Sequence, residues 1–279
     1  MEKKENPKKK DFNSVSHRAS SIFATIAIPV EFIICLVVFN GVMGNPANFI
    51  DGNLANNPLS GNYLGIVYKG GYVVPILMTL FLVVVTFFLE RLWTLRQAKG
   101  KQNPAKFVAK VKQLVASQDI EAAIKECDLQ CGSLANIIRA GLEKYQEMGK
   151  NGGLTSEKKA LALQKALEEA GAMETPILER NLAILSTIAS IATLMGLFGT
   201  VLGMVKAFAA LANAGAPDAV ALANGISEAL VNTALGIGTS ALAIVFYNYC
   251  TTRIDHIVYL AAEAGQAIVH TFSLHHNDK

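Results

Sequence analysis

Four long apolar stretches dominate the hydropathy pattern of the chain and predict four helices that cross a membrane. They cover residues 21–43, 71–93, 181–210 and 225–250. As a helix, each is long enough to cross the roughly 30 Å of hydrocarbon in a bilayer. The first stretch follows a basic tail, as the core of a signal peptide does. Because it is longer than an ordinary signal-peptide core and contains Pro29 and Glu31, we interpret it as a retained helix.

Between the second and third stretches, residues 94–180 alternate apolar and charged side chains at helical spacing, which predicts a helical domain. Asp119 is expected to cap one of its helices, and Ser156 is expected to cap a long helix that leads into the third stretch. Pro176 lies inside that long helix and is expected to kink it. The predicted fold class is therefore all-α, a polytopic membrane protein with four transmembrane helices and a helical domain.

The positions of lysine and arginine predict how the spans are oriented. Six of these residues lie in residues 1–20 and fourteen in residues 94–180, whereas residues 44–70 hold one and residues 211–224 none. Because basic segments stay on the cytoplasmic side, we expect three segments there. They are the N-terminal tail 1–20, the helical domain 94–180 and the C-terminal tail 251–279. The loop 44–70 and the turn 211–224 then face the periplasm, and both termini are cytoplasmic.

The composition fits a membrane protein and argues against several other classes. Apolar residues make up 52% of the chain and charged residues 17%, against about a quarter in soluble domains. The net charge of +3 is too small to indicate nucleic-acid binding, and no nucleotide-binding or hydrolase motif occurs. We therefore expect no enzyme, cofactor or metal site. Cys127 and Cys131 lack the further ligands of a zinc site, and we interpret them as two buried thiols.

Polar side chains inside the third span lie on one face of the predicted helix. An unpaired polar group is costly in lipid, so these side chains should face protein or a watery path. At about 100° per residue, Thr193 and Thr200 share one arc, and Gly196, Gly199 and Gly203 occupy the neighbouring arc. We interpret the glycines as sites of close helix packing.

The fourth span is two-sided, with polar and small residues within roughly 140°. This side holds Glu228, Asn232, Thr233, Gly236, Thr239 and Ser240. An ionised carboxyl in hydrocarbon costs several kcal/mol, so Glu228 indicates a function or a partner. Lys206, at a similar depth on the third span, is a candidate for an ion pair with it, or extends to the lipid headgroups. Glu31 is interpreted as a packing or assembly carboxyl rather than a proton relay.

Three strings resemble signature regions of the ExbB and TolQ proton-channel family, to which MotA also belongs. They are LERLWTLR (89–96), GLFGTVLGMVKAF (196–208) and GISEALVNTALG (225–236). The resemblance implies that Thr200, Glu228 and Thr233 line a proton pathway. Secondary pore candidates on the same two spans are Thr193, Asn232, Thr239 and Ser240.

The resemblance also implies partners and a location in the bacterial inner membrane. The chain would form a homo-oligomeric ring, a pentamer, around the helices of an ExbD-like one-span subunit. It would be the stator of a proton-driven motor that acts through a TonB-like protein on outer-membrane transport. Membrane lipids would be further partners, and no nucleic acid would bind. The sequence departs from the family pattern in three places. Thr193 and Leu242 stand where the family often has proline, and the first span is additional to the usual three.

Other functions remain open at this point. Within the family, the alternatives are a TolQ-like role in envelope integrity and a MotA-like flagellar stator. From another class, the chain would be a secondary transporter or a passive membrane scaffold. Transporters commonly show internal repeats and broken helices, which this sequence does not display, and a scaffold would tolerate the loss of Glu228.

Overall fold

The computed structural model describes residues 11–54, 56–150, 154–212 and 218–275, and the backbone alone for residues 11–24. Among these residues the regular elements are helices and no strand occurs, which confirms the all-α class. Four of the helices are long and apolar enough to cross a membrane. The chain divides into two compact units, Met1–Phe87 with Ile184–Val245 and Phe88–Ala183 with Phe246–Lys279, which we describe separately.

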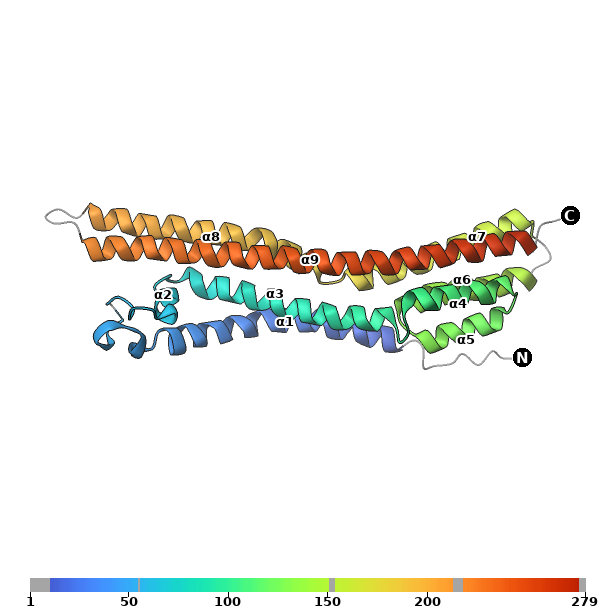
Figure 1. Cartoon of the computed structure of the whole chain (residues 1–279), viewed down its shortest axis with the longest axis horizontal. Coiled ribbons are helices and arrows are strands. Elements are labelled where there is room, and N and C mark those ends of the chain that lie inside the picture. Colours follow the sequence, from blue (N-terminus) through green and yellow to red (C-terminus); the bar gives the residue numbers. More distant parts are fainter. Residues whose placement is uncertain (1–10, 55, 151–153, 213–217, 276–279) are drawn as a thin grey trace. The chain divides into compact units, whose positions relative to one another are not determined.

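Nine α-helices are labelled in the part of the chain that the structure describes (Figure 1). They are α1 (Asp11–Val38), α2 (Tyr63–Tyr68), α3 (Val73–Lys99), α4 (Pro104–Ala116), α5 (Ile120–Gln130), α6 (Ser133–Lys150), α7 (Ser156–Glu179), α8 (Leu182–Leu211) and α9 (Ala219–His275). The membrane candidates are α1, which continues into a π-helical turn, α3, α8 and α9.

Helix α9 is far longer than a membrane requires. Its 57 residues extend for roughly 85 Å at about 1.5 Å per residue, against about 30 Å of hydrocarbon. The segment after residue 250, expected as a tail, therefore continues the last membrane helix as far as His275. The predicted turn 211–224 is shorter in the structure, because α9 already begins at Ala219. Residues 213–217 of this turn lie outside the described residues.

In the first unit, α8 and α9 run side by side with their backbones in direct contact (Figure 1). Glycines leave no side chain between the two helices. A Cβ atom on Gly203 would lie 2.7 Å from the carbonyl oxygen of Gly225, and one on Gly236 would lie 2.6 Å from that of Ala192. Such distances are below any ordinary contact, so only glycine fits these positions, as in close-packed membrane helices generally.

Gly236 and Gly238, two residues apart on α9, give a matched test of this packing. A Cβ atom on Gly236 meets the backbone of α8, whereas one on Gly238 has nothing within 4 Å. We expect Gly236→Ala to lower the free energy of unfolding by about 1–3 kcal/mol, the cost of overpacking. Gly238→Ala should be neutral or stabilise by up to ~1 kcal/mol through helix propensity. Thermal unfolding in detergent micelles measures both, and equal melting temperatures would contradict the backbone contact.

Helix α1 buries an acidic side chain in the first unit. Glu31 is 6% exposed, and its carboxyl faces the hydroxyl of Thr86 on α3. Its Oε2 atom has no hydrogen-bond partner among the described residues. Cys35, one turn further along α1, is also buried. Glu31 therefore lies between two helices of one chain.

The second unit packs α4–α7 against the C-terminal part of α9. Its apolar core includes Phe107, Leu134, Ile138, Leu163 and Phe272, which are all fully buried. Such side chains supply most of the free energy that holds a helical domain together, at about 25 cal/mol for each Å² of apolar surface removed from water.

The helix ends in the second unit agree only in part with those that the sequence predicts. Asp119 caps α5, because its carboxyl oxygen accepts a hydrogen bond from the Ala122 backbone at 3.0 Å. Pro176 lies inside α7, as predicted. Ser156, however, is the first residue of α7 and Thr155 is the capping position, so the predicted Ser156 cap is wrong. Helix α7 ends at Glu179 and does not run on into α8, because the chain turns at Asn181 with a φ of 62°.

The interpretation of two buried thiols is correct for one cysteine only. Cys127 is buried in α5, and burial raises the pKa of its thiol to about 12. Cys131 is exposed, with a φ of 57°. The reason is that α5 ends at Gln130, so Cys131 no longer shares a helix face with Cys127.

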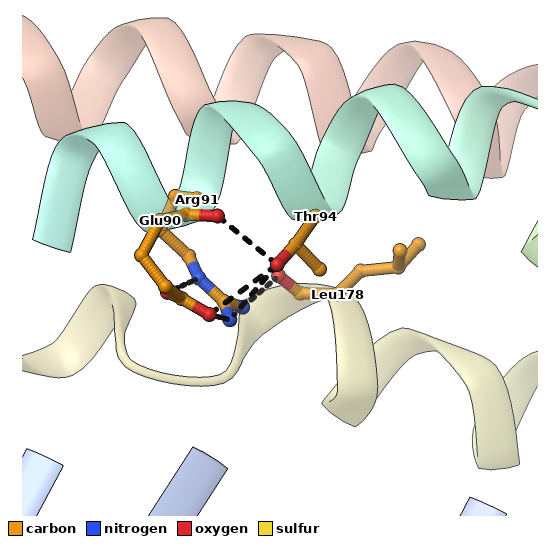
Figure 2. A network of polar contacts seen from close by, with 4 residues as sticks. All are labelled: Glu90, Arg91, Thr94 and Leu178. Carbon is orange, nitrogen blue, oxygen red and sulfur yellow. Dashed lines mark hydrogen bonds and ion pairs between the residues drawn. The ribbon is translucent and has the colours of Figure 1, made fainter. Parts of the chain in front are cut away.

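A buried arginine connects α3 to the end of α7 (Figure 2). The side chain of Arg91 is only 2% exposed, and its guanidinium donates to the carbonyl oxygen of Leu178 and pairs with Glu90. Thr94, one turn along α3, donates to the Glu90 carbonyl oxygen at 3.0 Å. A cation at a helix C-terminus satisfies free carbonyls and complements the helix dipole. Arg91 therefore stabilises the point where α7 ends.

Candidate functional site

A line of polar side chains follows the contact between α8 and α9 in the first unit. We call this line the polar seam, and it comprises Thr200, Lys206, Glu228, Asn232, Thr233 and Ser240. The remaining surface of both helices is largely apolar and exposed, as a lipid-facing or subunit-facing surface would be. The polar seam is therefore the candidate functional site within the membrane spans.

Thr200 of α8 and Thr233 of α9 share a hydrogen bond between their hydroxyls. Each hydroxyl also lies within hydrogen-bond distance of a carbonyl one turn back in its own helix, Gly196 at 3.2 Å and Ala229 at 3.1 Å. Both threonines are half-buried. Two hydroxyls carry two protons and four lone pairs, and their mutual bond occupies one lone pair. The pair therefore keeps free acceptor capacity at a partly accessible position.

Glu228 and Lys206 form an ion pair between the same two helices. The Lys206 Nζ atom lies 2.6 Å and 2.8 Å from the two carboxylate oxygens of Glu228. The Glu228 side chain is 9% exposed and that of Lys206 is 53% exposed. Because the cation balances the carboxylate, Glu228 does not place an uncompensated charge in the span.

Gly71, two residues before α3, makes room for this carboxyl. It has a φ of 74°, and a Cβ atom there would lie 2.5 Å from the Glu228 Oε1 atom. Both the backbone conformation and the space favour glycine. The carboxyl of Glu228 is thus enclosed by α8, α9 and the chain just before α3.

The secondary pore candidates occupy different surroundings. Asn232 is fully buried and donates to the Gly70 carbonyl oxygen at 2.9 Å, and Ser240 donates to that of Ala189. Thr239 is buried on the same helix, whereas Thr193 on α8 is half-buried. Asn232, Ser240 and Thr239 therefore take part in packing within one subunit.

One hydrogen-bonding group of Asn232 stands out. Its Oδ1 atom is buried without a partner among the described residues. Gly199 of α8 packs on this side chain, since a Cβ atom on Gly199 would lie 2.5 Å from that of Asn232. The absence of a side chain at Gly199 thus lets the asparagine reach across to Gly70.

The ion pair predicts a measurable coupling between its two residues. Lys206→Met leaves the Glu228 carboxylate buried without its cation, so we expect a loss of stability. Glu228→Gln in the same chain removes that charge and should recover most of the loss. Because Lys206 is half exposed, the expected coupling energy is about 1–2 kcal/mol rather than that of a fully buried pair. Thermal unfolding of the two single variants and the double variant measures it, and strictly additive effects would show that the pair does not interact.

Together, the four long apolar helices and the polar seam define a multi-pass membrane protein with a hydroxyl-lined, charge-compensated contact between two spans. Residues 131–263, which include all of α8 and the seam, match the MotA/TolQ/ExbB proton channel family. The chain belongs to this family.

Three relatives illustrate the similarity. A putative biopolymer transport protein ExbB-like 3 of Synechocystis is 30% identical over 181 residues, which cover 64% of this chain and 80% of the relative. The Tol-Pal system protein TolQ of Pseudomonas aeruginosa is 31% identical over 137 residues, 48% of this chain and 59% of the relative. The biopolymer transport protein ExbB of Pseudomonas putida is 27% identical over 184 residues, 65% of this chain and 55% of the relative. The matched region thus spans little more than half the length of the TolQ protein.

Proposed function

We propose that the chain is an ExbB-like stator subunit of a proton-driven motor in the bacterial inner membrane. The observation that carries this proposal is the hydroxyl pair of Thr200 and Thr233, which is partly accessible between two largely apolar spans. Membership of a proton channel family supports it. In this role the chain performs no enzymatic reaction and provides a wall along which a proton carrier moves.

The hydroxyl pair has the hydrogen-bonding capacity that such a wall needs. A protonated carboxyl of a partner helix donates one hydrogen bond, and the free lone pairs of Thr200 and Thr233 accept it. An ionised carboxyl accepts hydrogen bonds instead, and a threonine hydroxyl that turns away from its own helix carbonyl donates one. The pair therefore serves a partner carboxyl in both protonation states. Protonation removes the charge that makes passage along apolar side chains costly.

Glu228 completes the proposed pathway near one end of the seam. Its ion pair with Lys206 keeps a carboxylate inside the span at no net charge. A proton that reaches Glu228 would release Lys206, whose side chain is half exposed, and a proton that leaves would restore the pair. The proposed pathway residues are therefore Thr200, Glu228 and Thr233.

We further propose that the chain assembles into a ring around its partner helices. A ring of five copies would enclose helices of an ExbD-like one-span subunit, whose membrane carboxyl carries the proton, and a TonB-like protein would transmit the motion to outer-membrane transporters. The large exposed apolar side chains of α8 and α9 offer the surface for neighbouring subunits, partner helices and lipid. These include Phe198, Val201, Val205, Leu230, Ile237 and Val245. The charge distribution supports both termini on the cytoplasmic side.

A TolQ-like role in envelope integrity is the second candidate, because two of the similar proteins are TolQ proteins, at 31% and 38% identity. Expression of the chain in bacteria that lack their own ExbB, and separately in bacteria that lack TolQ, decides between the two. Restored energy-dependent uptake across the outer membrane supports the ExbB-like role. Restored resistance to detergents with no uptake supports the TolQ-like role.

Removing one seam hydroxyl tests the pathway directly. Thr233→Val keeps the shape of the side chain and removes the hydroxyl that pairs with Thr200, so we expect energy-dependent uptake to fall by at least about tenfold, which corresponds to about 1.4 kcal/mol. Thr252→Val is the matched control on α9. Its hydroxyl also bonds one turn back, to Asn248 at 2.9 Å, but it lies outside the seam.

Glu228→Ala should abolish uptake as well, whereas a passive scaffold would tolerate it. The assay requires that each variant is inserted and assembled to the wild-type level, measured by membrane fractionation and size-exclusion chromatography. Wild-type uptake with Thr233→Val and Glu228→Ala would refute the pathway.

A further inference from the structure

The second unit contains a cavity of about 370 Å³ that is separate from the polar seam. Its size is at the small end of the roughly 300–1,000 Å³ range of ligand pockets. Four of the residues that line it carry a guanidinium, an ammonium or an imidazole group, namely Arg96 and Lys99 of α3 and Arg253 and His256 of α9. We call this cavity the basic pocket.

The charges of the basic pocket are not neutralised by the chain itself. In the part of the chain that the structure describes, Arg96, Lys99 and Arg253 make no ion pair with a carboxylate. Asp255 lies between Arg253 and His256 in the sequence but does not line the pocket. Three cationic residues therefore line one cavity of the second unit, so the pocket favours an anion.

Helix α4 adds to this preference. It begins at Pro104, and both this residue and the capping Asn103 line the pocket. Asn103 uses its side-chain oxygen to accept from the Ala105 backbone. The positive end of the helix dipole thus lies at the cavity that the cations line, as in many phosphate sites.

The remainder of the pocket is apolar and lies next to the membrane spans in sequence. Leu95 and Ile257 are buried side chains of its lining. The pocket residues of α3 follow the predicted span 71–93, and those of α9 begin at Tyr249, at the end of the predicted span 225–250. Trp93 and Tyr249 are exposed aromatic residues at these ends. Such residues are typical of the membrane–water interface.

We propose that the basic pocket binds the phosphate group of an anionic phospholipid. The cations hold the phosphate, the apolar lining contacts the glycerol and the start of the acyl chains, and the aromatic residues mark the headgroup level. Basic pockets at the ends of membrane helices recognise lipid headgroups in this way. This binding site goes beyond the proposed proton pathway and shares no residue with it.

Each basic residue also has a simpler structural role, which the test must separate. Arg96 and Lys99 lie in the last turn of α3, where cations complement the helix dipole. Arg253 donates to the Tyr249 hydroxyl at 3.2 Å and lies over its ring. Neither the helix-dipole interaction nor the Tyr249 contact requires cationic residues of two helices to line one cavity. Phosphate binding does require this.

The test measures lipid binding to the purified full chain by native mass spectrometry. The chain is titrated in detergent with phosphatidylglycerol, with phosphatidylcholine and, in a third series, with inorganic phosphate. We expect saturable binding of phosphatidylglycerol in preference to phosphatidylcholine. Binding by Arg96→Gln/Arg253→Gln should be about 25-fold weaker, since each of the two cations contributes about a factor of five.

The control variant removes the same number of charges elsewhere in the second unit. Lys125→Gln/Lys158→Gln alters two exposed lysines that do not line the pocket. It should bind phosphatidylglycerol as the wild type does. Arg96→Lys/Arg253→Lys keeps both charges and should retain most of the binding. Melting temperatures without lipid verify that each variant folds.

The outcomes distinguish the sources of the phosphate. Preference for phosphatidylglycerol that depends on Arg96 and Arg253 supports the site with a lipid as its ligand. Saturation by inorganic phosphate, with the same dependence and without a lipid preference, supports the site with soluble phosphate as its ligand. The proposal is overturned if Arg96→Gln/Arg253→Gln and the control Lys125→Gln/Lys158→Gln weaken lipid binding equally, or if neither variant weakens it. None of these results depends on proton-driven uptake, so the lipid-binding experiment and the uptake experiments test the two proposals independently.

Discussion

The direct contact between the backbones of α8 and α9 is the constraint on which the rest of the first unit depends. Glycines at positions such as Gly203 and Gly236 bring the two helices together without side chains between them. At this distance short hydroxyls meet across the helix contact, so Thr200 and Thr233 bond to each other. The longer Lys206 and Glu228 side chains pair beside them. The hydroxyls of both threonines and the charges of Lys206 and Glu228 thereby find partners within the protein, as hydrocarbon surroundings favour.

Much of this arrangement follows from the sequence, because the determining signals are local. Apolar runs of membrane length predict α1, α3, α8 and the first part of α9. The cap at Asp119 and the glycine packing follow from residue type and helical spacing. The angular positions of Thr200, Thr233 and Glu228 indicate which faces are polar. Their pairing requires the register between two helices, which no single sequence provides.

What the sequence did not reveal depends mostly on contacts between distant segments. Asn232 bonds to Gly70, and Arg91 bonds to Leu178, across 162 and 87 residues. The continuation of α9 to His275 did leave a signal, since Ile254, Ile257, Ala261, Ala264 and Ile268 recur at intervals of three or four residues and are all buried. That pattern is typical of a helix stripe that packs on a partner, and it outweighs the polar residues that suggested a tail.

A structure of the assembled complex in lipid nanodiscs, at a resolution that shows side chains, tests the proposed proton pathway most directly. We predict that the hydroxyls of Thr200 and Thr233 face an enclosed axis within hydrogen-bond distance of a partner carboxyl. An axis surrounded by hydrocarbon side chains alone, with both threonines directed at lipid or at a neighbouring copy of the chain, would contradict it.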